Sequence, residues 1–500
     1  MPNDHILAID QGTTSTRAVV FDKIGQPLGS AQKPHRQIFP QAGWVSHDPE
    51  EIFANTVETA RDALANARLS QKDIAAMGIT NQRETLVLWD VRTGEPICDA
   101  IVWQCRRSAD ICAQMEKDGM AGLIRERTGL LIDPYFTATK LKWAIDNIPQ
   151  VRSLMAQGYL RAGTIDSYLI FRLTKGKVHI TDYTNAARTM LFDIVKGCWD
   201  KDILSYLDID EGILPQVVSS SGIVAHTDPE YFDIPIAGIA GDQHAALFGQ
   251  AGINPGDAKN TYGTGCFLLK NIGDEALIEP GGLLTTIAWH INGKTTYALE
   301  GGIFNAGSAV EWLMRELKLA KDVHEINDIC NNTPDTDGAY FIPAFSGLGA
   351  PHWDMYARGT ICGLSLSTGK NHIVRAVMEA VAFQSRDLID HMNEVSGLPL
   401  PQLQVDGGVS KSDFTMQFQA DLLGIPVERP RYTETTALGA CYLAALGVGL
   451  FTDLQEIARS RTVDKVFIPS VARSEMEAHY QLWKKAVKRA EGWLNTEYEK

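Results

Sequence analysis

The feature that most limits the possible folds is a turn rich in glycine and hydroxyl side chains, flanked by two apolar runs, which occurs twice in the chain. The first copy spans residues 6–21 with the turn Asp-Gln-Gly-Thr-Thr-Ser at 10–15, and the second spans 258–269 with the turn Gly-Thr-Gly at 263–265. Each copy has the pattern of a β-hairpin. Two related hairpins about 250 residues apart predict two structurally similar halves rather than a short-period repeat array.

The segments between the hairpins indicate an α/β fold. Strand-like runs at 74–80 and 85–89 alternate with helical patterns, and one helix is predicted to begin at Asp48, an N-cap residue followed by proline. In the second half, apolar residues at helical spacing predict a helix over 372–392 and an amphipathic closing helix from Ser474. Leu403 to Gly408 is predicted to be a short strand that ends in Asp-Gly-Gly.

The position of the domain boundary depends mainly on the repeated hairpin, because no linker or low-complexity segment marks it. A chain of 500 residues exceeds what one hydrophobic core usually organises. We therefore predict an N-terminal domain over 1–250 and a C-terminal domain over 251–500.

Charge and hydropathy exclude several classes of partner. The net charge of −15, without polybasic runs, argues against binding to nucleic acid or anionic lipid. The longest apolar run, 437–451, has 15 residues, fewer than the roughly 20 that span a bilayer, so we expect a buried helix and no stable membrane insertion. The first ten residues lack the pattern of a secretory signal, and the eight cysteines include no Cys-x-x-Cys pair. Reduced thiols in a cytoplasmic protein are the expectation.

The two turns have the chemistry of a phosphate site. Small side chains let successive backbone N–H groups and hydroxyls converge on an anion, and Asp10 at the end of the first strand is suited to hold Mg²⁺. One such turn alone is better explained as an ordinary turn, but a second copy favours nucleotide phosphates. No Gly-x-x-x-x-Gly-Lys-[Ser/Thr] segment and no protein-kinase motif set is present, which excludes those two nucleotide sites.

A second group of residues suits a small polar acceptor. Within 238–246 an apolar strand gives way to a helix at Asp242, where a carboxylate is placed to accept a proton and Gln243 to hydrogen-bond a hydroxyl. The plain alternative is that Asp242 caps the helix. Arg83 and Glu84 lie between two apparent strands, where a solvated bend is the alternative to a ligand site. Aromatic residues such as Trp103 and Tyr135 are suited to wall a carbon skeleton, although on spacing alone they would be assigned to the core.

These segments together resemble the FGGY family of carbohydrate kinases, and in particular its members that phosphorylate glycerol. The resemblance covers nearly the whole chain and is carried by the segments Asp10–Ser15, Asn81–Glu84, Trp103–Arg107, Asp133–Phe136, Asp182–Ala186, Gly241–Gln243, Thr261–Phe267, Gly347–Pro351 and Asp406–Gly408. It implies two actin-, hexokinase- and Hsp70-like domains, which are ribonuclease H-like, flanking a catalytic cleft.

The resemblance also implies residue roles. Glycerol hydroxyls would be held by Arg83, Glu84, Tyr135, Asp242 and Gln243, with Trp103 and Phe267 against the carbon skeleton and Asp242 as the general base. ATP phosphates would be bound by Thr13, Thr14, Ser15, Arg17 and Thr264, with Asp10 organising Mg²⁺ for catalysis, while Gly307, Glu311, Gly408 and Ser412 would surround the nucleoside. At two of these positions the chain departs from the family pattern, since Glu311 stands where Gln is common and Ser412 where Asn is common.

The implied activity is ATP-dependent phosphorylation of glycerol to sn-glycerol 3-phosphate in glycerol catabolism, by a cytoplasmic homodimer or homotetramer. Some bacterial relatives bind fructose 1,6-bisphosphate through a glycine-rich loop, but here 228–233 is acidic, so we predict no such inhibition. Two alternatives remain open. One is a kinase of this family for another polyol or a ketose such as xylulose, and the other is a nucleotide-driven assembly protein of the actin or Hsp70 type.

Overall fold

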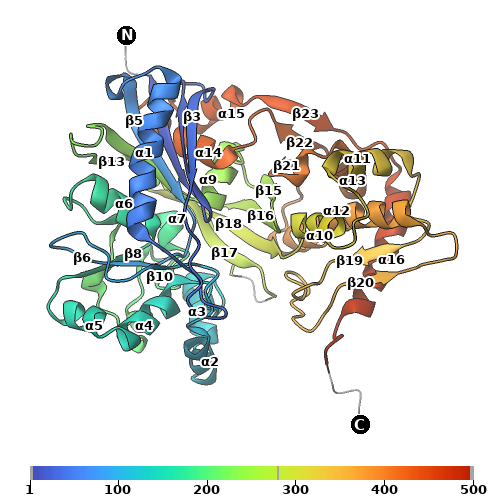
Figure 1. Ribbon diagram of the computed structural model, residues 1–500, viewed down its shortest axis with the longest axis horizontal. Coiled ribbons are helices and arrows are strands. Elements are labelled where there is room, and N and C mark those ends of the chain that lie inside the picture. The colour runs from blue at the N-terminus through green and yellow to red at the C-terminus, as the bar shows by residue number, and fades with distance from the viewer. Residues whose placement is uncertain (1–3, 279–280, 496–500) are drawn as a thin grey trace.

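Two mixed β-sheets with helices against their faces form the computed structural model, which describes residues 4–278 and 281–495 (Figure 1). The first sheet has the order β13-β14-β5-β1-β2-β3 and the second the order β17-β18-β16-β15-β21-β22-β23. The strands of the first sheet are β1 His5–Gln11, β2 Ser15–Phe21, β3 Pro27–Pro34, β5 Ile74–Asn81, β13 Ser221–His226 and β14 Pro235–Gly241. Those of the second are β15 Ala258–Tyr262, β16 Cys266–Gly273, β17 Leu284–Ile291, β18 Lys294–Ile303, β21 Leu403–Asp406, β22 Val427–Pro430 and β23 Val463–Phe467.

The two sheets repeat one strand pattern. In the first, β1 pairs antiparallel with β2 and parallel with β5, then β14 pairs parallel with β5 and β13 pairs antiparallel with β14. In the second, β15 pairs antiparallel with β16 and parallel with β21, then β22 pairs parallel with β21 and β23 pairs antiparallel with β22. The predicted α/β fold with two similar halves built on related hairpins is confirmed.

Helices and short strands complete both halves. The helices are α1 Pro49–Ala67, α2 Ala109–Lys117, α3 Ala121–Thr128, α4 Thr137–Asn147, α5 Pro149–Ala156, α6 Ile165–Leu173, α7 Tyr183–Ala186, α8 Lys201–Tyr206, α9 Asp242–Gly249, α10 Gly307–Arg315, α11 Val323–Asn332, α12 Lys370–Ser396, α13 Asp413–Leu423, α14 Thr435–Gly447, α15 Leu454–Ser460 and α16 Arg473–Ala490. The short strands are β4 Ser46–His47, β6 Val87–Asp90, β7 Ala100–Ile101, β8 Leu160–Gly163, β9 Ile180–Asp182, β10 Phe192–Asp193, β11 Cys198–Trp199, β12 Gln216–Val218, β19 Tyr340–Ile342 and β20 Thr360–Cys362.

The predicted helices at 48, 372–392, 437–451 and 474 correspond to α1, α12, α14 and α16. The carboxylate of Asp48 accepts from the backbone N–H of Glu50 at 2.9 Å, so the helix begins where the cap predicts. Successive apolar residues of β1 point to opposite faces of the sheet. Leu7 and Ile9 pack in the hydrophobic cluster that contains α1, and Ile6 and Ala8 pack in the cluster that contains α14.

Helix α14 joins the two halves, because it follows β22 in the second half and packs on β14, β5 and β1 of the first sheet (Figure 1). It also packs closely on α9: a Cβ on Gly439 would lie 1.8 Å from the carbonyl oxygen of Ala245, so only glycine fits there. The proposed boundary near residue 250 falls between α9 and β15 and stays a prediction, since a segment beyond it completes the core of the first half.

Two further expectations concern the membrane and the thiols. Within residues 4–278 and 281–495, no helix combines the length and the apolar character needed to cross a bilayer. All eight cysteines are free thiols, as expected.

Candidate active site

The predicted acid and base groups come together at the carboxyl ends of three adjacent parallel strands. Asp10 lies near the end of β1, Arg83 and Glu84 follow β5, and Asp242 follows β14. The register places Asp10 beside Thr80 of β5. This edge of an α/β sheet is where such folds bind ligands.

Asp242 is the first residue of α9, but it is not the capping residue, which is Gly241. Its Oδ1 accepts from the backbone N–H of Gln243 at 2.7 Å and lies 3.0 Å from Nε of Arg83. The side chain is 28% exposed, and its second oxygen has no hydrogen-bond partner among the described residues. The missing Cβ of Gly241 leaves room for Arg83, whose Cγ would lie 2.7 Å from it. One carboxylate oxygen is therefore anchored and the other is available to an acceptor.

Arg83 and Glu84 are buried, not a solvated bend, with exposures of 3% and 1%. Arg83 makes a bidentate pair with Glu300, at 2.6 and 3.0 Å. Arg188 donates to Glu84 at 2.7 Å and to Glu300 at 3.3 Å, which closes a network of two arginines and two carboxylates. Burial raises the pKa of Glu84, against the opposing effect of Arg83 and Arg188. Burial also disfavours ionised Glu300, but Arg188 and Arg83 hold its pKa well below the usual range.

Arg188 and Glu300 were not predicted from the sequence. Arg188 lies two residues beyond the segment Asp182–Ala186 that carried part of the resemblance. Glu300 is a carboxylate in the buried part of β18, and a charge at a buried strand position is the signal that would have marked it.

One of the predicted aromatic walls, Trp103, contacts the first turn. Trp103 and Tyr135 pack edge to face with ring centroids 5.5 Å apart. The indole Nε1 of Trp103 donates to Oγ1 of Thr13 at 3.0 Å. The acceptor side of the site is thus contiguous with the turn predicted to bind phosphates.

Gln243 and Phe267 are joined through a buried lysine that the sequence analysis also missed. Nζ of Lys259, on β15, donates to the side-chain oxygen of Gln243, to Oγ1 of Thr261 at 2.8 Å and to the carbonyl oxygen of Phe267 at 3.2 Å. Burial lowers the pKa of Lys259 to about 8, opposed by the carboxylates of Asp406 and Asp242.

Asp10 has the surroundings of a carboxylate that would bind a cation. Its side chain makes no ion pair within the described part of the chain, and its pKa is raised to about 7, first by burial and further by Asp242 and Glu434, with Arg17 opposing. No group of three or more His, Cys, Asp or Glu side chains that could hold a metal occurs in the described ranges. A single carboxylate fits Mg²⁺, which usually takes one or two carboxylates together with waters and substrate phosphates.

The first turn presents Thr14 to solvent, with Thr13 and Ser15 partly exposed. Oγ of Ser15 accepts from Gln32 at 2.7 Å. The guanidinium of Arg17 forms an ion pair with Glu434, which immediately precedes α14.

The second turn borders a pocket of about 350 Å³, a volume within the range of small-molecule sites. All five residues predicted for the second turn and the nucleoside line it, namely Thr264, Gly307, Glu311, Gly408 and Ser412. Apolar walls are supplied by Val310, Met314, Val323, Met378 and Val409. At the two positions that depart from the family pattern, Ser412 donates to Asn327 at 2.6 Å and Glu311 pairs with Arg315 at 2.7 Å.

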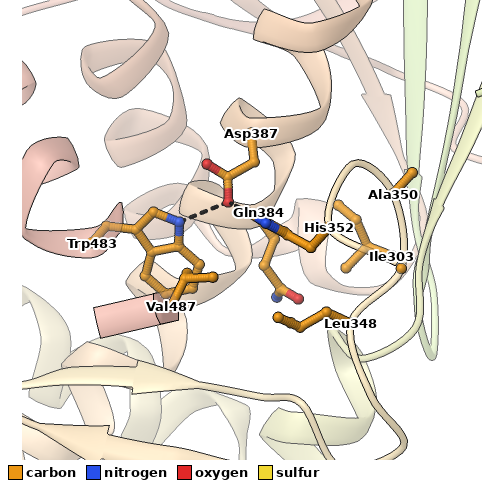
Figure 2. Close-up of a pocket in the computed structure, with 9 residues that line it drawn as sticks. Ile303, Leu348, Ala350, His352, Gln384, Asp387, Trp483 and Val487 are labelled. Atoms are coloured by element: carbon orange, nitrogen blue, oxygen red, sulfur yellow. Dashed lines mark hydrogen bonds and ion pairs between the residues drawn. The ribbon is translucent and has the colours of Figure 1, made fainter. Parts of the chain in front are cut away.

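A separate small cavity lies beside the buried carboxylate of Asp387. Trp483 donates to Asp387 at 2.8 Å, and a ring nitrogen of His352 lies 3.2 Å from it (Figure 2). The cavity holds about 10 Å³, room for about one water molecule. It is too small for a nucleotide or a polyol and is part of the packing between α12 and α16.

Each half of the chain matches a model of a known protein family. A model described as the FGGY family of carbohydrate kinases, N-terminal domain, matches residues 5–249, and the model of the C-terminal domain of the same family matches residues 258–448. Among curated proteins, the chain is 52% identical over 492 residues to a glycerol kinase of Alkaliphilus metalliredigens, covering 98% of each chain.

Solved structures share the fold. The structure of Plasmodium falciparum glycerol kinase with ADP matches with a TM-score of 0.92 and 37% identity, covering 97% of this chain and 98% of that one. A ligand-bound xylulose kinase from Lactobacillus acidophilus matches with a TM-score of 0.87 and 26% identity, covering 97% of both chains.

Proposed function

Because this chain belongs to the FGGY family of carbohydrate kinases, we propose that it transfers the terminal phosphoryl group of ATP to glycerol and forms sn-glycerol 3-phosphate. The observation that carries the proposal is the carboxylate of Asp242, which has one oxygen held by Arg83 and the other oxygen without a partner among the described residues. This carboxylate belongs to a site that also contains the buried Arg83 and Glu84 and the aromatic rings of Trp103 and Tyr135. This combination suits an acceptor that has several hydroxyl groups on a short carbon chain.

Glycerol binding would use both the charges and the rings. Glu84 accepts hydrogen bonds from acceptor hydroxyls, while Arg83 and Gln243 donate to them. Trp103, Tyr135 and Phe267 exclude water from the carbon skeleton. A ligand that lacks one hydroxyl leaves a buried polar group unpaired, which in such sites costs on the order of 10⁴-fold in kcat/KM.

Asp242 is the general base of the proposed reaction. Its anchored Oδ1 fixes the orientation of the carboxylate, and its second oxygen takes the proton from the attacking hydroxyl. Because Arg83 is neutralised mainly by its bidentate pair with Glu300, Asp242 is left able to accept that proton.

ATP would lie between the two turns. Thr13, Thr14, Ser15 and Arg17 on one side and Thr264 on the other bind the phosphates, and the apolar pocket beside Gly307, Glu311, Gly408 and Ser412 takes the nucleoside. Asp10 would hold Mg²⁺, and the bound ion would neutralise charge on the phosphates. We also propose that the enzyme works in the cytoplasm as a homodimer or homotetramer; its eight free cysteines suit a reducing compartment.

The test is ADP release by the purified protein with Mg²⁺ and ATP, measured with glycerol, with other polyols, with ketoses and without an acceptor. We expect glycerol to give the highest kcat/KM and the acceptor-free rate to be small. Preference for a ketose such as xylulose would assign the chain to another specificity in the same family. An equal rate without an acceptor would indicate a nucleotide-driven assembly protein.

A further inference from the structure

Two acceptor-binding side chains of the first half are held by buried charges that belong to the second half. Glu300, on β18 of the second sheet, makes the bidentate pair with Arg83 of the first half. Lys259, on β15 of the same sheet, donates to the side chain of Gln243 at the start of α9. Glu300 and Lys259 are 3% and 0% exposed, so neither serves to interact with solvent.

Lys259 also decides which way the amide of Gln243 points. An ammonium group has hydrogen-bond donors only, so the amide atom that faces it is the oxygen. The amide nitrogen then points elsewhere and is the atom left to donate to a ligand. Without the ammonium, both orientations of the amide become accessible, and only one of them offers a donor to an acceptor hydroxyl.

Glu300 has a comparable effect on Arg83. Two parallel hydrogen bonds fix the plane of the guanidinium, which leaves Nε directed at Asp242 at 3.0 Å. Glu300 also contacts Arg188, which in turn holds Glu84 at 2.7 Å. Glu300 therefore orients three groups of the first half that would face the acceptor. It holds Arg83 directly, Asp242 through Arg83, and Glu84 through Arg188.

We propose that Glu300 and Lys259 are positioning residues for the acceptor, through which the nucleotide-binding half completes the acceptor pocket of the other half. The proposal rests on the proposed function, because it assumes an acceptor bound by Arg83, Glu84 and Gln243. Neither residue has a part in the proposed chemical step, and neither lines the pocket proposed for the nucleoside. Their loss should weaken acceptor binding while ATP binding is retained.

The experiment compares Glu300→Gln and Lys259→Met with two matched controls in the second half. Lys270→Met removes another buried lysine, whose Nζ bonds Asn393 at 2.7 Å and Ser396 at 3.0 Å. Glu379→Gln removes another buried carboxylate, paired with Arg375 at 2.7 Å. Steady-state kinetics give KM for the acceptor and for ATP, and thermal unfolding reports the fold of each variant.

We expect KM for glycerol to rise ~10-fold or more in both test variants, the effect of losing a charge-assisted hydrogen bond, with KM for ATP within about twofold of the wild type. Both controls should keep both KM values even where they lower the melting temperature. An unchanged KM for glycerol in the test variants, or an equal rise in the controls, overturns the proposal. If Glu300→Gln does not fold, the two lysine variants decide.

The proposed function is tested separately by the wild type. If the wild type prefers another polyol or a ketose, the same KM comparison is made with that acceptor, and the positioning roles stand or fall independently of glycerol. If the wild type hydrolyses ATP equally without any acceptor, both the function and the positioning roles are refuted.

Discussion

Replacing Asp242 by Asn tests the general base with the smallest change in shape. The Asn carboxamide oxygen can keep both contacts of Oδ1, to Arg83 Nε and to the backbone N–H of Gln243, which are 3.0 and 2.7 Å long in the wild type. Arg83 also keeps its pair with Glu300 and is not left uncompensated. The free energy of unfolding should therefore change by about 1 kcal/mol or less, since a partly exposed pair contributes little.

The effect on the chemical step should be much larger. The Asn nitrogen would occupy the place of the free carboxylate oxygen, and it cannot accept a proton. Loss of a general base lowers kcat by roughly 10²- to 10⁴-fold, or about 3 to 5 kcal/mol in activation free energy. The rate of ADP release with saturating glycerol gives kcat. Nucleotide binding, measured by thermal shift, should be the same as in the wild type.

A matched control separates catalysis from helix capping. Asp200 is the buried N-cap residue of α8, and its carboxylate accepts from the backbone N–H groups of Asp202 and Ile203 at 2.9 and 3.0 Å. Because Asn caps as well as Asp, Asp200→Asn should leave kcat unchanged. A kcat of Asp242→Asn within tenfold of the wild type would refute the general-base role, and a similar loss in both variants would attribute the effect to the fold.

Four further outcomes are expected. Glu84→Gln should raise KM for glycerol by ~100-fold while KM for ATP stays the same, as judged by kinetics with each substrate varied in turn, because an amide replaces two acceptor oxygens with one. KM for glycerol should rise above pH 8, where Lys259 loses its proton among the surrounding charges of Asp242, Asp406, Arg83 and Glu300, and a flat pH profile would contradict this. Gly439→Ala should lower the melting temperature, since its Cβ would meet the carbonyl of Ala245 at 1.8 Å, and an unchanged melting curve would show that α14 can shift. Fructose 1,6-bisphosphate should not inhibit, because 228–233 carries acidic side chains, and inhibition at millimolar concentration would show that the loop was misinterpreted.

The features of the structure that were predicted from the sequence each depend on residues that are close together in the chain. The hairpin turns, the cap at Asp48 and the strand-to-helix change at Asp242 each depend on a few consecutive residues. The residues predicted to surround the nucleoside came from the resemblance to the FGGY family, and they line one pocket.

The groups that were missed depend on contacts between distant segments. Arg83 and Glu300 are 217 positions apart, and Arg188 lies 104 positions from Glu84. A local pattern can mark such a charge but not its partner, because the partner is set by the packing of distant segments. For the same reason, α14 was predicted to be a buried helix, but the sheet on which it packs was not predicted.

The placement of these missed charges bears on how such an enzyme avoids wasting ATP. In the proposed reaction water would compete with the polyol as the acceptor, and a site that only the polyol completes would suppress hydrolysis of ATP. Asp242 begins α9, which packs on α14, and these two helices lie where the halves meet. Any shift of one half against the other therefore alters the Arg83–Glu300 pair and the Lys259–Gln243 contact together with the position of the base. A water molecule has no carbon skeleton to pack on Trp103 and too few hydroxyls to satisfy these side chains. It therefore supplies little of the binding energy that would hold the two halves in the reactive arrangement.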